Sequence, residues 1–262
     1  MTSAPQIMTI AQWAHGAPWR LTLPHSQPQH ALIWITRGQA RAAVGGLRRG
    51  VGAHNALAVP AGTLFSLDIG PGCYGQVCLI PPGGPALMPD EPEHLRIREA
   101  QTQSELTALL EALTRETTQA RPFSDEAAQA LAIMMTVWLR RAMIAQEPGP
   151  QPTAAQRLVI AYAALVEQCH ASGQPMAAYA RDLGVTPTHL GRSCKACSGL
   201  TASDLLVQRI LHAARELLED GEDAILHVAA RLGFGSAAYF SRFIHAHTGL
   251  SPSALRRKAQ AA

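Results

Sequence analysis

Two stretches of this chain repeat one pattern: LGVTPTHLGRSCKACSGLTASDL at residues 183–205 and LGFGSAAYFSRFIHAHTGLSPSAL at residues 232–255. Each copy contains a short helix-forming segment that ends at a glycine, a tight turn, and a second helix-forming segment whose polar face carries an arginine. In register, Leu190 corresponds to Phe240, Arg192 to Arg242, Gly199 to Gly249 and Leu205 to Leu255. A repeated unit of this kind is typical of helix-turn-helix motifs that bind DNA.

Helix start and stop signals predict the two motifs at residues 175–198 and 224–248. The expected boundary residues are Gly184, Thr186, Pro187 and Gly199 in the first motif, and Gly233, Ser236 and Gly249 in the second. Between the motifs, Thr201 and Asp204 form a variant capping box before a helix with an apolar face. A linking helix of about 18 residues is ~27 Å long, close to the ~34 Å between successive major-groove faces of DNA. Both second helices could therefore face one duplex.

Length and charge fit a chain of two domains with a polyanionic partner. A chain of 262 residues suits two domains, and its 5% aromatic content with abundant Ala favours helices over a β-rich whole. Residues 1–152 carry 11 basic and 11 acidic side chains, whereas residues 153–262 carry 11 and 8. The net charge of +3 therefore comes entirely from the part with the repeat.

The chain shows no targeting or membrane signal, and we expect a cytoplasmic protein. Its first residues, MTSAPQIMTIAQWAHG, lack the basic and apolar segments of a signal peptide. The most apolar stretch, residues 127–139, is shorter than the ~20 residues that a membrane-spanning helix needs. The five cysteines show no spacing typical of secreted disulfide frameworks, so free thiols are expected.

Residues 1–98 are predicted to form a small antiparallel β domain. Short apolar or alternating runs such as ALIWIT (31–36), ALAVPAG (56–62) and YGQVCLI (74–80) are separated by Gly and Pro. This pattern is typical of the strands of a small barrel or sandwich.

Residues 99–147 are predicted to form two helices. Leucines at 106, 109, 110 and 113 form one stripe at helical spacing. The second helix, from Ser124 to about Ala145, is apolar nearly all round, which is compatible with burial in the chain's own core or with a subunit interface. The Pro- and Gly-rich residues 148–153 are expected to link this part to a helical domain at 154–262.

Residues 154–258 resemble the AraC/XylS family of bacterial transcription regulators. The resemblance rests on LGFGSAAYFSRFIHAHTGLSPSALRR in the second motif, and on LGVTPTHLGR and the following RILHAARELL (209–218) in the first. It implies two DNA-reading helices and a double-stranded DNA partner. The positions at which the family contacts bases are Thr188, Gly191 and Arg192 in the first motif, and Ala237, Ala238, Ser241 and Arg242 in the second. Further candidates for DNA contact are Thr186, His189, Lys195 and Ser236.

Among these residues, Arg192 is the strongest candidate for a bidentate guanine contact. A salt bridge to the scaffold is the alternative role for Arg192 and for Arg242. Gly191 has no side chain with which to read a base, and the two alanines offer only methyl groups. Direct readout is therefore expected to be thinner than usual, with more specificity from DNA shape. We expect the first helix to supply most base specificity and the second mainly register and affinity.

The remaining motifs with possible chemistry have structural explanations. Cys194 and Cys197 form a CxxC motif inside the first reading helix, where Cys194 and Ile244 occupy positions at which the family usually has a core Phe. A redox switch is the alternative for the two cysteines. His245 and His247 lie about 200° apart on a helix and cannot share a metal ion. We predict no catalytic residue, no metal site, no cofactor and no enzymatic activity.

The N-terminal half resembles the cupin-like sensor domain of the same family. Aligning the first cupin metal motif on Gly38 puts Ala31 at the Glu position, and the second motif has Phe65 in place of its His. A catalytic metal is therefore not expected. Residues that could line an effector cavity, each with core packing as the alternative, are His25, His30, Trp34, Phe65 and Tyr74.

The combined hypothesis is an α+β protein with a small cupin-like antiparallel β-barrel, a helical dimerisation element, and an all-α domain with two helix-turn-helix motifs. It would act as a homodimeric transcription regulator controlled by a small-molecule effector, with RNA polymerase as a partner if it activates. The alternatives are a ligand-independent regulator controlled by a protein partner, and a metal-dependent cupin enzyme fused to a DNA-binding domain.

Overall fold

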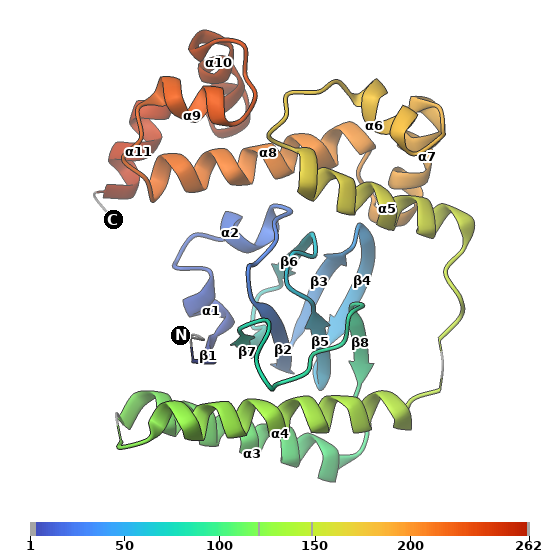
Figure 1. Ribbon diagram of the computed structural model, residues 1–262, viewed down its shortest axis with the longest axis vertical. Coiled ribbons are helices and arrows are strands. Elements are labelled where there is room, and N and C mark those ends of the chain that lie inside the picture. The colour runs from blue at the N-terminus through green and yellow to red at the C-terminus, as the bar shows by residue number, and fades with distance from the viewer. Residues whose placement is uncertain (1–3, 120, 148, 261–262) are drawn as a thin grey trace. The chain divides into compact units, whose positions relative to one another are not determined.

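The computed structural model describes residues 4–119, 121–147 and 149–260, and it consists of an antiparallel sheet region followed by a helical domain (Figure 1). The α+β class predicted from the sequence is confirmed. The chain divides into two compact units. The first contains residues 1–21, 26–44 and 48–151, and the second contains residues 152–262 together with the short segments 22–25 and 45–47.

The strands of the first unit form two antiparallel sheets. The five-stranded sheet has the order β1 (Gln6–Thr9), β7 (Tyr74–Ile80), β2 (His30–Arg37), β5 (Asn55–Val59) and β8 (Glu93–Arg96). The three-stranded sheet has the order β4 (Leu47–Gly52), β3 (Gln39–Val44) and β6 (Phe65–Ile69). Within the described residues, β4 pairs only with β3, and β8 only with β5. The strands therefore do not close into the barrel that the sequence led us to expect.

Burial of both faces of β2 explains why its sequence is a continuous apolar run. Ile33 and Ile35 belong to a core shared with the three-stranded sheet, in which Trp13 stacks on Phe65 at a centroid distance of 5.7 Å. Leu32 and Trp34, on the opposite face, belong to a second core with α3 (Ala100–Gln119) and α4 (Ser124–Ala145). A strand covered on both faces needs apolar residues at every position.

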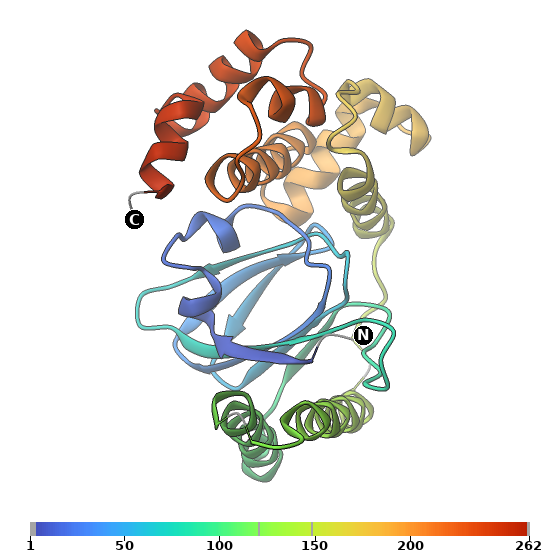
Figure 2. The same ribbon diagram turned by 60° about the vertical axis from the view of Figure 1, so that its left-hand side comes forward.

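Helices α3 and α4 lie side by side across one face of the five-stranded sheet (Figures 1 and 2). The leucine stripe predicted for α3 is buried at Leu106, Leu110 and Leu113. The indole N–H of Trp138 on α4 donates to the carbonyl of Thr102 on α3, at 2.9 Å. Two short helices, α1 (Ile10–Trp13) and α2 (Trp19–Thr22), complete the N-terminal part.

The second unit contains helices throughout. In the described residues these are α5 (Ala154–Cys169), α6 (Met176–Asp182), α7 (Pro187–Ser198), α8 (Ala202–Glu219), α9 (Ile225–Arg231), α10 (Ala237–Thr248) and α11 (Pro252–Gln260). The caps agree with the sequence signals. The side chains of Thr186 and Ser236 accept hydrogen bonds from the third residue of α7 and α10, and Gly199 and Gly249 end these helices at φ 83° and 72°. Every helix in the described residues is too short or too polar to span a lipid bilayer.

A buried ion pair ties the central helix to the start of this unit. The guanidinium of Arg209 on α8 donates from Nε and Nη2 to both carboxylate oxygens of Glu167 on α5, at 2.7 and 2.9 Å. The hydroxyl of Tyr162 donates to the carbonyl of Ala202 at 2.7 Å, which joins the same two helices. At the other end of α8, Arg256 donates to the carbonyls of Leu218 and Asp223. Helix α8 is therefore fixed at both ends.

Candidate nucleic-acid interface

Helix α7 presents a polar face on one side and a core face on the other. Leu190, Ser193, Cys194 and Ser198 are buried. Thr188, His189, Arg192 and Lys195 are exposed. The exposed residues recur at the three- and four-residue spacing that places side chains along one helix face. Gly191 lies among them, and a Cβ built there meets no atom within 4 Å. The face is therefore polar and cationic, with one open position.

Helix α10 has the same division. Phe240 and Ile244 are buried in the core beneath the helix, whereas Ala238 and Arg242 are exposed and Ala237 and Ser241 are half-buried. Neither Arg192 nor Arg242 forms an ion pair with another residue that the structure describes. The scaffold salt bridges considered from the sequence are absent from this part of the chain, and both guanidinium groups are available to a ligand.

Tyr239 is a surface residue of α10 that the sequence reasoning missed. Its side chain is 57% exposed, and the guanidinium of Arg242 lies 6.0 Å from the centre of its ring. In the register of the repeat, Tyr239 corresponds to His189, and each ring precedes an arginine by three residues. The repeat could have identified Tyr239, because His189 was already a candidate for DNA contact and Tyr239 is its equivalent in the second copy. The second helix therefore exposes an aromatic ring and a cation as well as small residues.

The CxxC motif faces the core. Cys194 is buried, and burial, reinforced by the neighbouring Cys197, raises the pKa of its thiol to about 12. A thiol with so high a pKa is a poor nucleophile and a poor metal ligand. Cys194 and Ile244 are core residues, as predicted. The described residues contain no group of three or more His, Cys, Asp or Glu side chains that could hold a metal ion.

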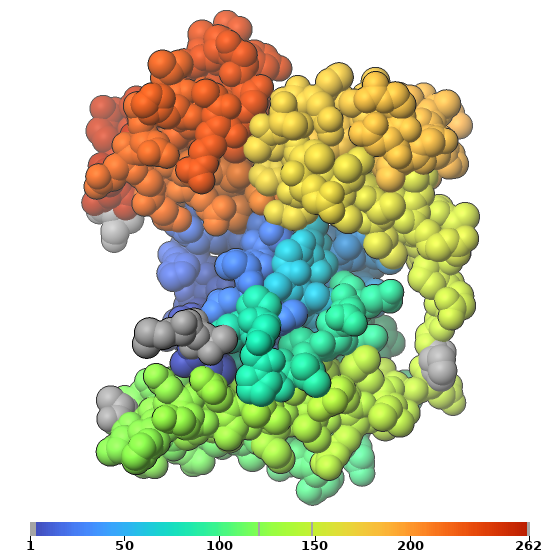
Figure 3. Space-filling model, in the orientation of Figure 1, coloured from blue at the N-terminus to red at the C-terminus, as the bar shows by residue number. Residues whose placement is uncertain are grey.

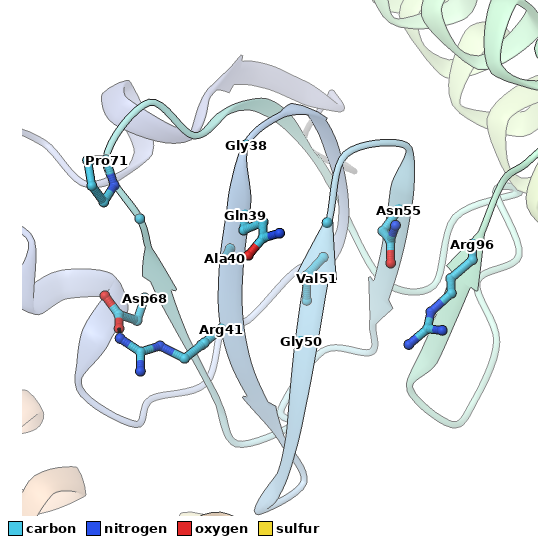
Figure 4. Close-up of a pocket in the computed structure, with 12 residues that line it drawn as sticks. Gly38, Gln39, Ala40, Arg41, Gly50, Val51, Asn55, Asp68, Pro71 and Arg96 are labelled. Carbon is cyan, nitrogen blue, oxygen red and sulfur yellow. Dashed lines mark ion pairs between the residues drawn. The ribbon is translucent and has the colours of Figure 1, made fainter.

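The first unit contains a cavity of about 870 Å³. Its lining includes Arg41 and Asp68, which form an ion pair at 3.1 Å, and Figure 4 shows Arg96 on the opposite side with Asn55 between. The remaining lining residues are mostly small: Gly38, Gln39, Ala40, Gly50, Val51, Gly52, Gly70 and Pro71. No aromatic side chain is among them. Glycines inside strands are typical of places where a ligand approaches the backbone closely.

The five residues proposed from the sequence as an effector site do not line this cavity. Trp34 and Phe65 are core residues, 1% and 2% exposed. Tyr74 is 61% exposed, near Arg37, and His30 is half-buried, where it accepts a hydrogen bond from the Ala61 N–H. The buried ring of His25 belongs to the second unit and stacks on His212 at 4.4 Å. Burial and the nearby His212 lower the pKa of His25 to about 3.

The cavity escaped sequence reasoning because that reasoning selected aromatic and histidine side chains as ligand contacts. In the structure, Phe65 packs in the core between the two sheets, and Trp34 packs in the core under α3 and α4. The cavity instead lies over glycines and charged residues, which have no distinctive pattern in one sequence.

One comparison, with models of protein families, agrees with the two motifs. A family model described as a helix-turn-helix domain matches residues 179–258. No curated protein matches the sequence. Among solved structures, the chain is similar to ToxT from Vibrio cholerae O395, at 12% identity and a TM-score of 0.45, over 98% of this chain and 100% of that one. It is also similar to the C-terminal domain of the response regulator AraT from Geobacillus stearothermophilus, at 27% identity and a TM-score of 0.37, over 42% of this chain and 88% of that one.

A third similar structure is a transcriptional regulator from Chromobacterium violaceum, described as having an AraC-type DNA-binding domain, at 24% identity and a TM-score of 0.36, over 40% of this chain and 94% of that one. The family model covers α7, α10 and the residues that carry the sequence resemblance. Residues 179–258 therefore form a helix-turn-helix domain, which supports a DNA-binding transcription regulator.

Proposed function

We propose that α7 and α10 read specific DNA sequences from successive major grooves of one duplex. The observation that carries this proposal is the repeated exposed face, with Arg192 and Arg242 at equivalent positions and neither engaged in an ion pair among the described residues. Arg192 is proposed to contact guanine through two hydrogen bonds. The other proposed contacts are Thr186, Thr188, His189, Gly191 and Lys195 on the first motif, and Ser236, Ala237, Ala238 and Ser241 on the second.

Tyr239 changes the division of labour that the sequence suggested. An exposed tyrosine can pack its ring against a thymine methyl group or donate its hydroxyl to a phosphate. Its ring also limits the positions open to the Arg242 guanidinium. We therefore propose that the second helix contributes to base readout through the Tyr239 and Arg242 pair.

The test compares binding of variants to a duplex selected from a random library by the parent protein. Arg192→Ala should weaken specific binding by about 1–3 kcal/mol and relax the base preference at one position. Tyr239→Ala and Arg242→Ala should do the same at another position, whereas Arg115→Ala, which removes an exposed charge from α3, should have little effect. Fluorescence anisotropy at fixed salt measures each affinity. Unchanged binding by Arg192→Ala and Arg242→Ala would refute the assignment.

The first unit is proposed to bind a small polar effector in the cavity beside Arg41 and Arg96. The cations and the amides around them suit a carboxylate that also carries hydroxyl groups. Gly50→Val tests the site, because a side chain at Gly50 meets no atom within 4 Å and would extend into the open space. Thermal shift with D-gluconate, and with neutral D-sorbitol as its matched analogue, should show a response to gluconate in the parent chain and none in Gly50→Val.

A regulator controlled by a protein partner is the main rival. This rival hypothesis predicts that no small carboxylate shifts the melting temperature. It also predicts that a partner protein binds to the first unit. Stoichiometric metal in the purified protein would favour the enzymatic alternative.

The proposed organisation is a sensor domain at 1–98, a helical element at 99–147, a linker at 148–153 and a DNA-binding domain at 154–262. The protein is further proposed to work in the cytoplasm as a homodimer, with RNA polymerase as a partner if it activates transcription.

A further inference from the structure

The loop between α5 and α6 contacts the turn of the second helix-turn-helix motif through two glycines. Gly173 in the loop has φ 70°, and a Cβ atom built there would overlap the carbonyl oxygen of Gly233 in the turn. Gly233 has φ 75°, and a Cβ atom built there would lie 2.7 Å from the Gly173 Cα and 2.8 Å from the Ala171 carbonyl oxygen. Non-bonded carbon atoms pack best at about 3.5–4.0 Å. The two backbones therefore touch directly and leave no room for a side chain, an arrangement called the Gly173–Gly233 contact below.

The first motif has an equivalent glycine without such a contact. Gly184 and Gly233 both follow a leucine at the end of the first helix of their motif. Gly184 has φ 68°, close to the value at Gly233, and both backbone N–H groups donate to the carbonyl three residues earlier. A Cβ atom built at Gly184 meets no atom within 4 Å. The left-handed conformation therefore accounts for glycine in both motifs, whereas the contact with another segment is specific to the second.

The loop is attached to both motifs. On one side, the Tyr179 hydroxyl of α6 donates to the Cys169 carbonyl at the end of α5, at 2.9 Å, and α5 packs against α7. On the other side, Ala171 packs against the hydrophobic core beneath α10, which contains Phe240 and Ile244. Figure 3 shows the yellow surface of the α5–α6 segment meeting the orange surface of the second motif. The loop therefore bridges the two motifs through residues outside α8.

We infer that the Gly173–Gly233 contact fixes the orientation of the second motif relative to the first, and thereby determines which spacing between two DNA subsites the protein accepts. Helix α8 alone is a single connection, about which the second motif could turn. A second contact away from α8 removes this rotation. The faces of α7 and α10 then form one rigid pair, which fits two subsites at one separation and one helical phase of the duplex. This inference rests on the proposed DNA reading by α7 and α10, and it assigns Gly173 and Gly233 as positioning residues.

The contact should matter most when the spacing between the subsites is wrong. One inserted base pair moves the second subsite by about 3.4 Å along the duplex and by about 35° around it. A rigid pair cannot follow that displacement, so the second motif loses its base contacts. Because two linked modules bind about 100-fold or more tightly than one, the parent chain should bind the duplex with the insertion about 100-fold more weakly. A chain without the contact can turn its second motif, so its loss should be about tenfold or less.

Three alanine variants test the spacing, and one of them is a matched control. Gly173→Ala and Gly233→Ala each disrupt the contact by adding a Cβ atom, whereas Gly184→Ala adds the same atom at a similar φ into open space. Fluorescence anisotropy measures the ratio of the dissociation constants for the library-selected duplex and for the same duplex with one base pair inserted between the two subsites. This ratio should change about tenfold in both contact variants and keep the parent value in Gly184→Ala.

The same ratio decides the outcome when an alanine variant does not fold. Insertion of two glycines after Ser172 lengthens the loop without adding a side chain, and it should change the ratio in the same way. Folded contact variants, or a folded insertion variant, that keep the parent ratio would overturn the inference.

A measurement without DNA separates this inference from the proposed function. Spin labels at Ala196→Cys on α7 and Ala246→Cys on α10, two exposed and equivalent positions, report the distance between the helices in a chain whose half-buried cysteines are replaced by serine. Double electron–electron resonance should give a narrow distance distribution for the parent and for Gly184→Ala, and a broader one for Gly233→Ala. Equal distributions in all three would overturn the inference. A broadened distribution in a protein that selects no specific duplex would support the fixed orientation and refute the proposed function.

Discussion

The buried ion pair between Arg209 and Glu167 makes a strong prediction about the stability of the second unit. Their side chains are 9% and 16% exposed, and two hydrogen bonds join them. Arg209→Ala leaves the Glu167 carboxylate buried without its cation, which costs about 3–5 kcal/mol where burial is complete. Because Glu167 keeps some exposure, we expect about 3 kcal/mol. With a urea m-value of about 1–3 kcal/mol/M, the midpoint of unfolding falls by at least about 1 M.

The distribution of chromophores allows each unit to be followed separately. The four tryptophans, at 13, 19, 34 and 138, all belong to the first unit. Arg209→Ala should shift the helical signal in far-UV circular dichroism and leave the tryptophan fluorescence transition in place. The double variant Glu167→Leu with Arg209→Met, which removes both charges, should recover most of the loss. An unchanged circular dichroism midpoint for Arg209→Ala, or no recovery in the double variant, would refute the reasoning.

Three further predictions concern single positions. Gly191→Ala should stabilise the second unit by up to about 1 kcal/mol, since the site is open and helical, and a lower circular dichroism midpoint would contradict this. Gly38→Ala should destabilise the first unit by on the order of 2 kcal/mol, since φ is 80° and the added Cβ would lie 2.7 Å from the Cys73 Cα; the tryptophan transition measures it. Burial, with Arg49 and Arg96 nearby, lowers the pKa of His94 to about 4. The unfolded chain binds a proton at His94 at higher pH than the folded chain does, so the first unit should lose stability as pH falls from about 6.5 towards 4. His94→Gln should reduce this pH dependence. The tryptophan fluorescence transition, measured at several pH values, tests it.

The helical part of the chain is accessible to sequence reasoning because its signals are local. A cap such as Thr186 acts on a backbone N–H three residues away, and a glycine such as Gly199 ends a helix through its own φ. The register of the repeat likewise aligns Arg192 with Arg242 by counting residues alone. The same register could also have identified Tyr239, because it aligns with His189, which was a candidate for DNA contact from the sequence.

The sheet region was less accessible because its arrangement depends on contacts between distant segments. Short apolar runs in the sequence indicated the strands, but their division into two sheets depends on which strands pair with each other. The prediction of effector contacts was limited for the same reason. Trp34 and Phe65 are residue types that often line a cavity, and only the tertiary structure shows that both are packed inside hydrophobic cores.

The sequence alone determined that the chain carries two helix-turn-helix motifs and where their helices begin and end, because hydrogen bonds and side-chain periods within a few residues set both. Only the tertiary structure decided that the sheets stay open, that the cavity lies over glycines and charged residues, and that Arg192 and Arg242 form no ion pair within the described residues. These features depend on which surfaces remain after the cores have packed, and burial of apolar area is a property of the whole fold.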